Sequence, residues 1–391
     1  MIVSLDRRTY EKYQSFPEGE LRILAQQYVV RNTEDPTETL YGCLNLTAAH
    51  ECPFLSADRL CKIQKELGVE TLSPTCSIYP RALNDVHGEI EVSLCLSCPE
   101  AARQVLLDPE FNNRVAGKEA SWFHTDQFSR LAANGEGLIH KPYGDFDEVR
   151  QAIVMLLRDR GRPLWQRMFL LGMLCKRLGE ISTPEQDAAV PEVLAAYAKV
   201  VATESQKQKL ENLASQPAAQ LDTVLWLSDL RLRAGGSGER FRECVMGALD
   251  GLGYAPQAPA PDYTRRYLQA ERQYLRPLLE EHPYLLENYL LNYIYRTLFP
   301  FGRQASAHFT PQDIYSEFLL LAAQYSMVQG LLIGLAGHYR EQFDVQHVVK
   351  LVQVLSKAIE HTPSFLVQIN DFLKTRNLAN PEGTLILLKI P

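Results

Sequence analysis

The fold is decided by residues 43–98, which read CLNLTAAHECPFLSADRLCKIQKELGVETLSPTCSIYPRALNDVHGEIEVSLCLSC. This stretch carries six of the eight cysteines, at positions 43, 52, 61, 76, 95 and 98. Prolines recur through the same part of the chain, and each one removes a backbone donor and restricts the residue before it. Long helices are therefore excluded here, and the pattern predicts a loop-rich cysteine module over residues 1–115.

Short elements are expected inside this module. Residues 88–95, GEIEVSLC, alternate between apolar and polar side chains, which predicts one strand, with a turn at Asn84-Asp85 before it. Two further stretches, Arg59–Leu67 and Pro99–Leu107, are typical of short helices.

The remainder, residues 116–391, shows helical periodicity. Apolar side chains recur every three or four residues, as at Phe146, Val149, Ile153, Leu156 and Leu157. The sequences TPEQ at 183–186 and TPQD at 310–313 each place a hydroxyl before a proline, which is a helix-start pattern. The predicted fold class is therefore mainly α, with the cysteine module followed by an all-helical domain.

Two stretches interrupt the helical pattern, AGGSGE at 234–239 and APQAPAPD at 255–262. The second is proline-stiffened and is a candidate division of the helical domain. Near the end, residues 384–390, TLILLKI, fit either a terminal strand or the last turn of a buried helix.

Composition limits the partners and the compartment. The 391 residues carry a formal net charge of −7, which argues against a nucleic-acid partner because such proteins gather Lys and Arg to neutralise phosphates. No unbroken run of eighteen apolar residues occurs, and Asp6, Arg7 and Arg8 interrupt the start before a signal peptide could form. We therefore expect a cytoplasmic protein without a membrane partner. Met1 leads into the middle of a strand pattern, which predicts a missing upstream segment.

The clustered cysteines favour a metal centre. In a reducing cytosol thiols stay free, so a cysteine cluster there is more typical of metal binding than of disulfides. Thiolates suit either tetrahedral zinc or an iron–sulfur cluster, and the spacing does not choose between the two. The alternative is that the cysteines are small buried residues. For Cys175 and Cys244, which lie in apolar helical contexts, we expect that core role.

Four segments resemble a known family. The strings CPFL (52–55), LCKIQKELG (60–68), TCSIYPR (75–81) and SLCLSCPEAA (93–102) are similar to the second half of the CxxCxxCC cysteine-rich segment of flagellin lysine-N-methylases of the FliB type. A second similarity covers ENYLLNY (287–293) and LFPF (298–301), which resemble an aromatic helix in the C-terminal part of that family.

The resemblance implies methylation of lysine side chains on flagellin with S-adenosylmethionine as methyl donor. It also implies an iron–sulfur cluster of the 4Fe-4S type, with zinc as the alternative. Cys52, Cys61, Cys76 and Cys98 match the family pattern as metal ligands, and Cys43 and Cys95 are alternates. The family's upstream cysteines are absent because the chain begins after the place they would occupy. The rival interpretation is a non-enzymatic metal-binding scaffold or redox sensor that docks a protein partner.

No catalytic residue is identified by the sequence, but one helix face is a candidate for binding substrate or cofactor. Tyr289, Asn292, Tyr293 and Arg296 recur at helical spacing, and aromatic faces can hold a sulfonium cation. Packing in the core is the plainer explanation of such a stripe. Neither a glycine-rich dinucleotide motif nor the cysteine triplet of radical enzymes occurs, so the cluster is expected to be structural or redox-active.

Overall fold

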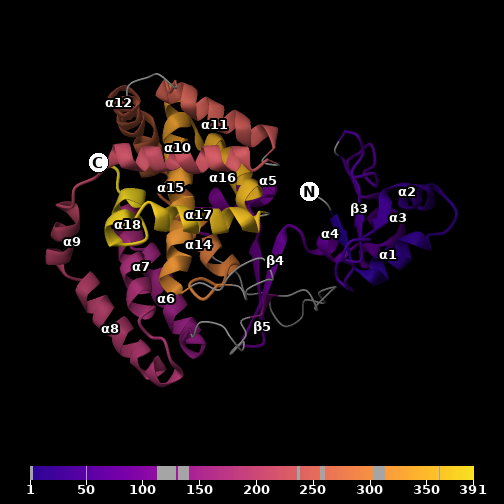
Figure 1. Cartoon of the computed structure of the whole chain (residues 1–391), viewed down its shortest axis with the longest axis horizontal. Helices are drawn as coiled ribbons and strands as arrows, with labels where there is room; N and C mark the ends of the chain where they lie inside the picture. Colours follow the sequence, from indigo (N-terminus) through magenta and orange to yellow (C-terminus); the bar gives the residue numbers. More distant parts are fainter. Residues whose placement is uncertain are drawn as a thin grey trace. The chain divides into compact units, whose positions relative to one another are not determined.

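The computed structural model describes residues 3–49, 51–111, 129–130, 141–235, 238–255, 260–302, 313–360 and 362–391. The described chain forms two compact units, a front unit that ends at Ala82 and a helical unit that begins at Leu83 (Figure 1). Most described residues of the helical unit are in α-helices, as the sequence predicts.

The front unit is built on a small antiparallel sheet. Its strands are β1 (Val3–Leu5), β3 (Gly42–Leu44) and β2 (Val29–Arg31), in that spatial order. Cys43 in the central strand lies opposite Ser4 and Val30. The helices are α1 (Arg7–Gln14), α2 (Glu20–Tyr28), α3 (Lys62–Leu67) and α4 (Pro74–Ile78). Strands of three residues are too short for alternation to be recognised, so β2 and β3 were not predicted.

A hairpin connects the two units. It consists of β4 (Arg81–Val86) and β5 (Glu89–Leu94), and β6 (Ser129–Arg130) lies parallel to β4. The strand at 88–95 is thus confirmed, whereas the turn predicted at Asn84-Asp85 is wrong. His87 and Gly88 form the turn, with φ of 50° and 85°, and two positive φ angles are what a tight hairpin turn requires. The carboxylate of Asp85 accepts a hydrogen bond from the Gly88 amide at 2.9 Å.

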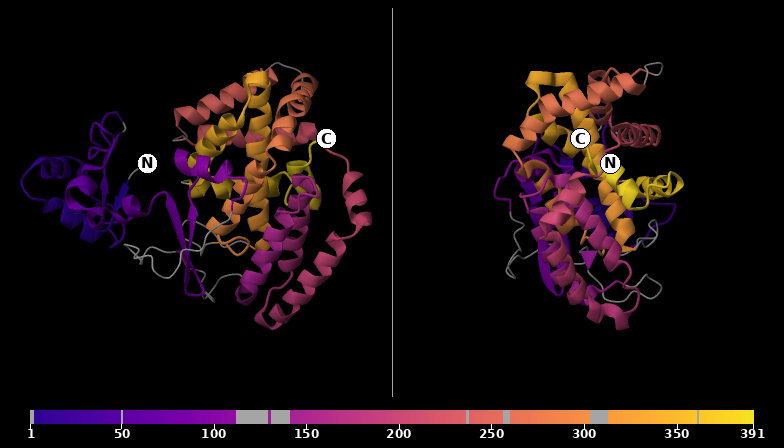
Figure 2. Two further views of the ribbon diagram at one scale, coloured as in Figure 1. Left: turned by 180° about the vertical axis from the view of Figure 1, so that it is seen from behind. Right: turned by 90° about the vertical axis from the view of Figure 1, so that its left-hand side faces the viewer.

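The helical unit contains fourteen described α-helices, α5 to α18, whose arrangement can be followed in Figures 1 and 2. They are α5 (Pro99–Leu106), α6 (Phe146–Leu157), α7 (Leu164–Leu178), α8 (Val190–Val201), α9 (Glu204–Glu211), α10 (Pro217–Arg233), α11 (Glu239–Leu252), α12 (Ala260–Ala270), α13 (Arg276–Glu281), α14 (Tyr284–Arg296), α15 (Ile314–Tyr339), α16 (Val345–Glu360), α17 (Pro363–Thr375) and α18 (Pro381–Leu388). Within residues 116–391, where the sequence predicts helices alone, the structure also describes the short strand β6, so the prediction of an all-helical domain is correct only in part.

Several predicted boundaries can be compared with these helices. A 3-10 turn at Pro184–Ala189 leads into α8. Thr310 to Gln312 lie outside the described residues, and the described helix begins at Ile314, where Asp313 caps the amide of Ser316 at 2.7 Å. Residues 384–388 are helical, which confirms the helix alternative for the C-terminal stretch. Residues 256–259 lie outside the described part of the chain. The predicted linker at 255–262 extends too far, because α12 already begins at Ala260.

The segment after β5 is attached to the helical unit by side-chain amides. Asn292 donates to the carbonyl of Leu94 at 3.0 Å, Gln353 to that of Ser97 at 2.6 Å, and Asn288 to that of Val105 at 2.9 Å. Each amide hydrogen bond satisfies a buried backbone acceptor. For this reason residues 83–111 belong to the helical unit, whereas the sequence-based division lies at residue 115.

Helix α15 runs through the middle of the helical unit (Figure 1). The stretch Ile314–Gln342 is long and apolar enough to cross a membrane, yet 94% of its apolar window is buried inside the unit. Such burial is typical of the core helix of a globular protein. Glycines allow its neighbours to approach closely: a Cβ at Gly330 would lie 2.6 Å from Val224, and one at Gly334 would lie 2.8 Å from the carbonyl of Ala248.

A buried ion-pair network links α14 to the start of α7. The carboxylate of Glu287, 3% exposed, accepts hydrogen bonds from Arg167 at 2.8 Å and from Arg160 at 2.9 Å. Arg167 is itself buried and also donates to the carbonyl of Leu157. Burial opposes ionisation of Glu287, but the hydrogen bonds from the two arginines outweigh it, so the pKa of Glu287 is lowered.

Replacing Glu287 by glutamine should therefore destabilise the helical unit. The substitution leaves the buried Arg167 guanidinium without its counter-charge, and we expect a loss of about 3 kcal/mol in the free energy of unfolding. Urea denaturation followed by circular dichroism measures it. The matched control is Glu100→Gln, which removes an exposed pair with Arg103 and should leave stability near that of the wild type. Equal stability of the Glu287→Gln variant and the control would contradict the assignment.

The same network predicts a pH dependence. Because the pKa of Glu287 is lower in the folded state than in the unfolded chain, its stabilising contribution is complete above the unfolded value of about 4.3 and is lost as the pH falls through the folded value. The difference in unfolding free energy between wild type and Glu287→Gln should thus shrink below about pH 4. A difference that stays constant from pH 7 to pH 3 would exclude this linkage.

Candidate functional site

Three of the four predicted metal ligands belong to the front unit. Cys52 begins a turn in which its carbonyl accepts from the Leu55 amide at 3.0 Å, and Cys61 forms an isolated antiparallel bridge with Leu55. The loop between these cysteines therefore folds back on itself. Both residues pack against the same apolar cluster, which includes Phe54.

Cys76 is held near this loop through Tyr13. Ser73 caps α4 by accepting a hydrogen bond from the Cys76 amide at 3.2 Å, and the Ser73 amide donates to the Tyr13 hydroxyl at 3.1 Å. The Tyr13 ring packs edge-on against Phe54, with 6.0 Å between centroids. Tyr13 thus connects the start of α4 to the loop that carries Cys52 and Cys61.

The three thiols also share one electrostatic environment. Burial raises the pKa of Cys52, and the thiols of Cys76 and Cys61 raise it further. Cys76 retains exposed surface, yet burial is the first cause of its raised pKa and Cys61 adds to it. Neighbouring thiolates repel one another, and a bound cation removes that penalty. The donor chemistry therefore fits a soft metal.

The remaining cysteines lie elsewhere. Cys98 caps α5 in the helical unit, and its amide donates to the carbonyl of Cys95 at 3.2 Å. Cys43 lies in β3, with its thiol 3.9 Å from the side-chain oxygen of Asn45. Within the described ranges, no group of three or more His, Cys, Asp or Glu side chains is arranged to hold a metal ion. The four-cysteine site, with Cys98 as a ligand, stays a prediction. Cys175 and Cys244 are buried in the core, as expected.

The predicted face of α14 is packed inside the helical unit. Tyr289 and Arg296 are at most 9% exposed, and Asn292 uses its amide to hold β5. The Tyr293 hydroxyl accepts from Gln324 at 3.5 Å, and the guanidinium of Arg296 lies 6.0 Å from the Tyr293 ring centroid. These contacts attach α14 to β5 and α15. Their participation in substrate or cofactor binding stays a prediction.

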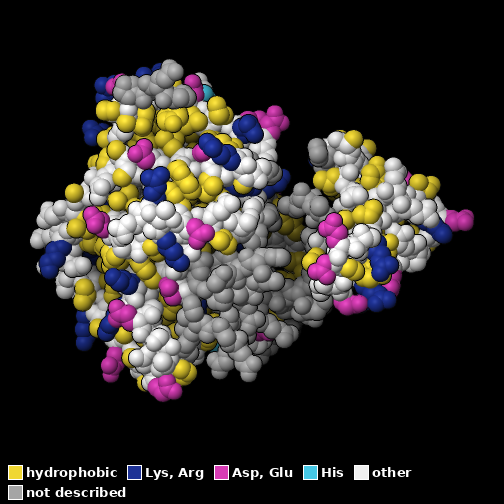
Figure 3. Space-filling view, viewed as in Figure 1, with side chains coloured by type: hydrophobic (Ala, Val, Ile, Leu, Met, Phe, Trp, Pro, Cys, Tyr) yellow, Lys and Arg dark blue, Asp and Glu magenta, His cyan; other side chains and the backbone are white. Residues whose placement is uncertain are grey.

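A cleft that the sequence analysis missed lies where α10, α11 and α12 meet, with α15 at its base. Its volume is about 410 Å³. Among its lining residues are three aromatic side chains and two carboxylates: Trp226, Tyr254, Tyr263, Asp222 and Asp229. The available signal was weak: Asp222, Trp226 and Asp229 recur at helical spacing on α10, so they share one face. Figure 3 shows hydrophobic side chains gathered on the surface over these helices.

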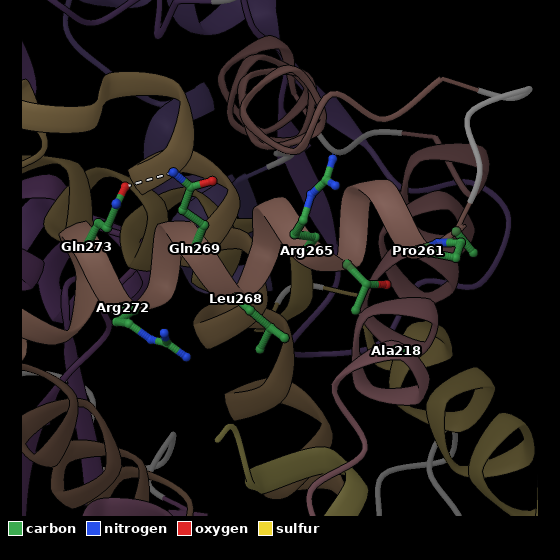
Figure 4. A pocket seen from close by; sticks show the side chains of 9 residues that line it. Ala218, Pro261, Arg265, Leu268, Gln269, Arg272 and Gln273 are labelled. Carbon is green, nitrogen blue, oxygen red and sulfur yellow. Dashed lines mark hydrogen bonds between the residues drawn. The ribbon is translucent and has the colours of Figure 1, made fainter.

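A second hollow, of about 640 Å³, follows α12 (Figure 4). Its polar groups do not converge. In Figure 4 Arg265 and Arg272 extend to opposite sides of the helix, and Gln269 donates to Gln273 at 3.1 Å along the helix surface. Arg265 also pairs with Asp262 at 3.1 Å. This hollow therefore lacks the convergent polar groups that define a ligand site.

The chain is similar to a family model and to individual proteins, over matches of different length. The family model described as the FliB lysine N-methylase C-terminal domain matches residues 150–387, more than half of the chain. Over 109 residues, 28% of this chain, the sequence is 37% identical to a lysine-N-methylase of Salmonella typhimurium (strain LT2) and to the flagellar biosynthetic protein FliU of Salmonella muenchen.

These matches cover only part of the relatives. The aligned region spans 27% of the lysine-N-methylase and 63% of FliU. No solved structure matches the chain. The family model alone extends across α6 to α18, and on that match the chain belongs to the FliB lysine N-methylase family.

Proposed function

We propose that this chain acts in the S-adenosylmethionine-dependent N-methylation of lysine side chains on flagellin. The observation that carries the proposal is the family match over residues 150–387. The names of the relatives, lysine-N-methylase and a flagellar biosynthetic protein, suggest the reaction and a flagellar substrate.

The reaction is a displacement at the methyl carbon of the donor. The lysine nitrogen attacks with its lone pair, the bond from carbon to sulfur breaks, and its electrons stay on sulfur to give S-adenosylhomocysteine. The amine must first lose a proton, since the reference pKa of lysine is about 10.4. The protein must then align nitrogen, carbon and sulfur. An aromatic, acidic environment suits both cations, the lysine ammonium and the sulfonium.

The cysteines of the front unit are proposed to hold an iron–sulfur cluster. Cys52, Cys61 and Cys76 would supply three thiolates, with Cys98 as the predicted fourth ligand. In this role the cluster stabilises the loops that surround Tyr13 or responds to redox state. Support comes from the contacts that link the segments carrying Cys52, Cys61 and Cys76 within the front unit and from the soft donor set.

The activity is tested by incubating the purified chain with flagellin and S-adenosylmethionine. Mass spectrometry of flagellin peptides should show lysines heavier by one methyl group, and S-adenosylhomocysteine should appear in equal amount. The control omits the chain. Unmodified flagellin together with a correctly folded chain, judged by circular dichroism, would contradict the proposal and favour the metal-binding scaffold.

The metal site is tested separately on anaerobically purified protein. Wild type should absorb visible light and contain several iron atoms per chain, and Cys61→Ser or Cys76→Ser should lower the iron content strongly because each variant loses one thiolate ligand. Cys244→Ala is the control, because that cysteine is 4% exposed in the helical core. Colourless protein with one zinc, or serine variants with unchanged iron, would rule out the cluster.

A further inference from the structure

The cleft between α10, α11 and α12 has the size and enclosure of a small-molecule site. Its volume of about 410 Å³ falls in the usual range for ligand pockets. Apolar side chains of α10, α11 and α15 form its deep part, among them Val224, Val245 and Leu331. The close approach of α15 to α10 at Gly330, which also lines the cleft, brings α15 up to its base.

Three aromatic rings surround the opening. Trp226 is 37% exposed and is held in place by stacking on Phe372, with 4.0 Å between ring centroids. Tyr254 is 38% exposed and lies edge-on to Tyr263, with centroids 5.3 Å apart. These partly exposed aromatic faces around one apolar cleft are typical of the lining of a ligand pocket.

The position of Tyr254 is fixed by the end of α11. Gly253 adopts a left-handed conformation, with φ of 59°, and its amide donates to the carbonyl of Asp250 at 2.8 Å. The Tyr254 amide donates to the carbonyl of Leu249 at 2.9 Å. This pair of hydrogen bonds is a Schellman motif. The ring of Tyr254 is therefore held at the cleft by a rigid helix end rather than by a free loop.

The charged side chains that line the cleft carry a net negative charge. Asp229 is paired with Arg233 at 2.8 Å. Asp222 is exposed, forms no ion pair with the described residues, and lies close enough to Tyr263 to raise the pKa of that hydroxyl, after the larger effect of burial. Arg233 also lines the cleft, so the three charged groups together leave one excess negative charge beside the aromatic rings.

We propose that this cleft binds an organic cation on an apolar stem, with Asp222 facing the charge and Trp226, Tyr254 and Tyr263 packing around it. Aromatic faces attract cations through the ring quadrupole, and a neighbouring carboxylate adds a direct attraction. The inference rests on the proposed function, in which two such cations occur: the lysyl side chain, with or without methyl groups, and the sulfonium of S-adenosylmethionine.

Calorimetric titration of the full chain with two pairs of probes tests the proposal. The first pair is S-adenosylmethionine and S-adenosylhomocysteine, which lacks the sulfonium charge, and the second is acetyl-trimethyllysine amide and the uncharged acetyl-norleucine amide. We expect the cationic member of one pair to bind about tenfold more tightly than its neutral partner, because the charge interacts with the rings. The pair whose cationic member binds more tightly than its neutral partner shows whether the cation is the sulfonium or the lysyl side chain.

Variants connect the binding to the cleft. Asp222→Asn and Tyr254→Leu should each weaken the cationic probe by roughly tenfold and leave the neutral probe unchanged. Asp371→Asn, which removes an exposed carboxylate from α17, is the charge-matched control and should bind as wild type does. Because Asp222 is exposed and forms no described ion pair, its variant is expected to fold, and circular dichroism checks this.

Two outcomes would overturn the inference: no preference for the cationic member of either pair, or equal loss of affinity in Asp222→Asn and Asp371→Asn. The measurement needs neither flagellin nor turnover. Methylation of flagellin without cation binding in the cleft would therefore reject the site and leave the proposed function intact. Cation binding in the cleft without methylation of flagellin would reject the proposed function and leave the binding site intact.

Discussion

The burial of α15 is the constraint on which the helical unit depends. A helix of 26 residues that is apolar nearly all round cannot face water, so it must be covered on every side. Its neighbours approach closely where glycine leaves room, as at Gly334 beside Ala248 and at Gly251 beside Gly334. α10, α11, α12 and α16 take their places around this helix (Figures 1 and 2). The cleft with the aromatic rings depends on this arrangement, because α15 forms its base.

Polar side chains on α14 bind the irregular backbone near α5 and β5 to the otherwise apolar helical unit. Asn288 and Asn292 hold backbone carbonyls near α5 and β5, and Glu287 is paired with Arg160 and Arg167. A buried charge is tolerated only when it is paired, and a buried amide only when it is hydrogen-bonded. The residues that look unusual on an aromatic helix thus have structural partners, and the features that suggest a ligand site lie on other helices.

The sequence predicted much of the fold because its strongest signals are local. The periodic stripe from Phe146 to Leu157 is a buried helix, and Cys175 and Cys244 are core residues. The hairpin turn was misplaced because asparagine and aspartate favour turns in general, whereas positive φ at two consecutive positions selected His87-Gly88. Of the three-residue strands of the front unit, β2 and β3 have no recognisable pattern in the sequence.

The candidate sites were less accessible to sequence reasoning. The cysteine spacing and family similarity predict one metal site for Cys52, Cys61, Cys76 and Cys98, a prediction that stays open. They do not predict the link through Tyr13, which forms only in the folded front unit. The cation cleft combines residues from four helices, and each of its aromatic rings has an ordinary local context. Tyr254 can be recognised as a site residue only from the structure, because the helix end at Gly253 determines where its ring lies.

Hydrogen–deuterium exchange of the full chain, read by mass spectrometry, tests the central role of α15 most directly. If the unit is built around this helix, amides of α15 exchange only through global unfolding, whereas those of α9, which buries a single side chain, exchange earlier through local opening. Exchange of α15 at the rate of α9 would contradict the account.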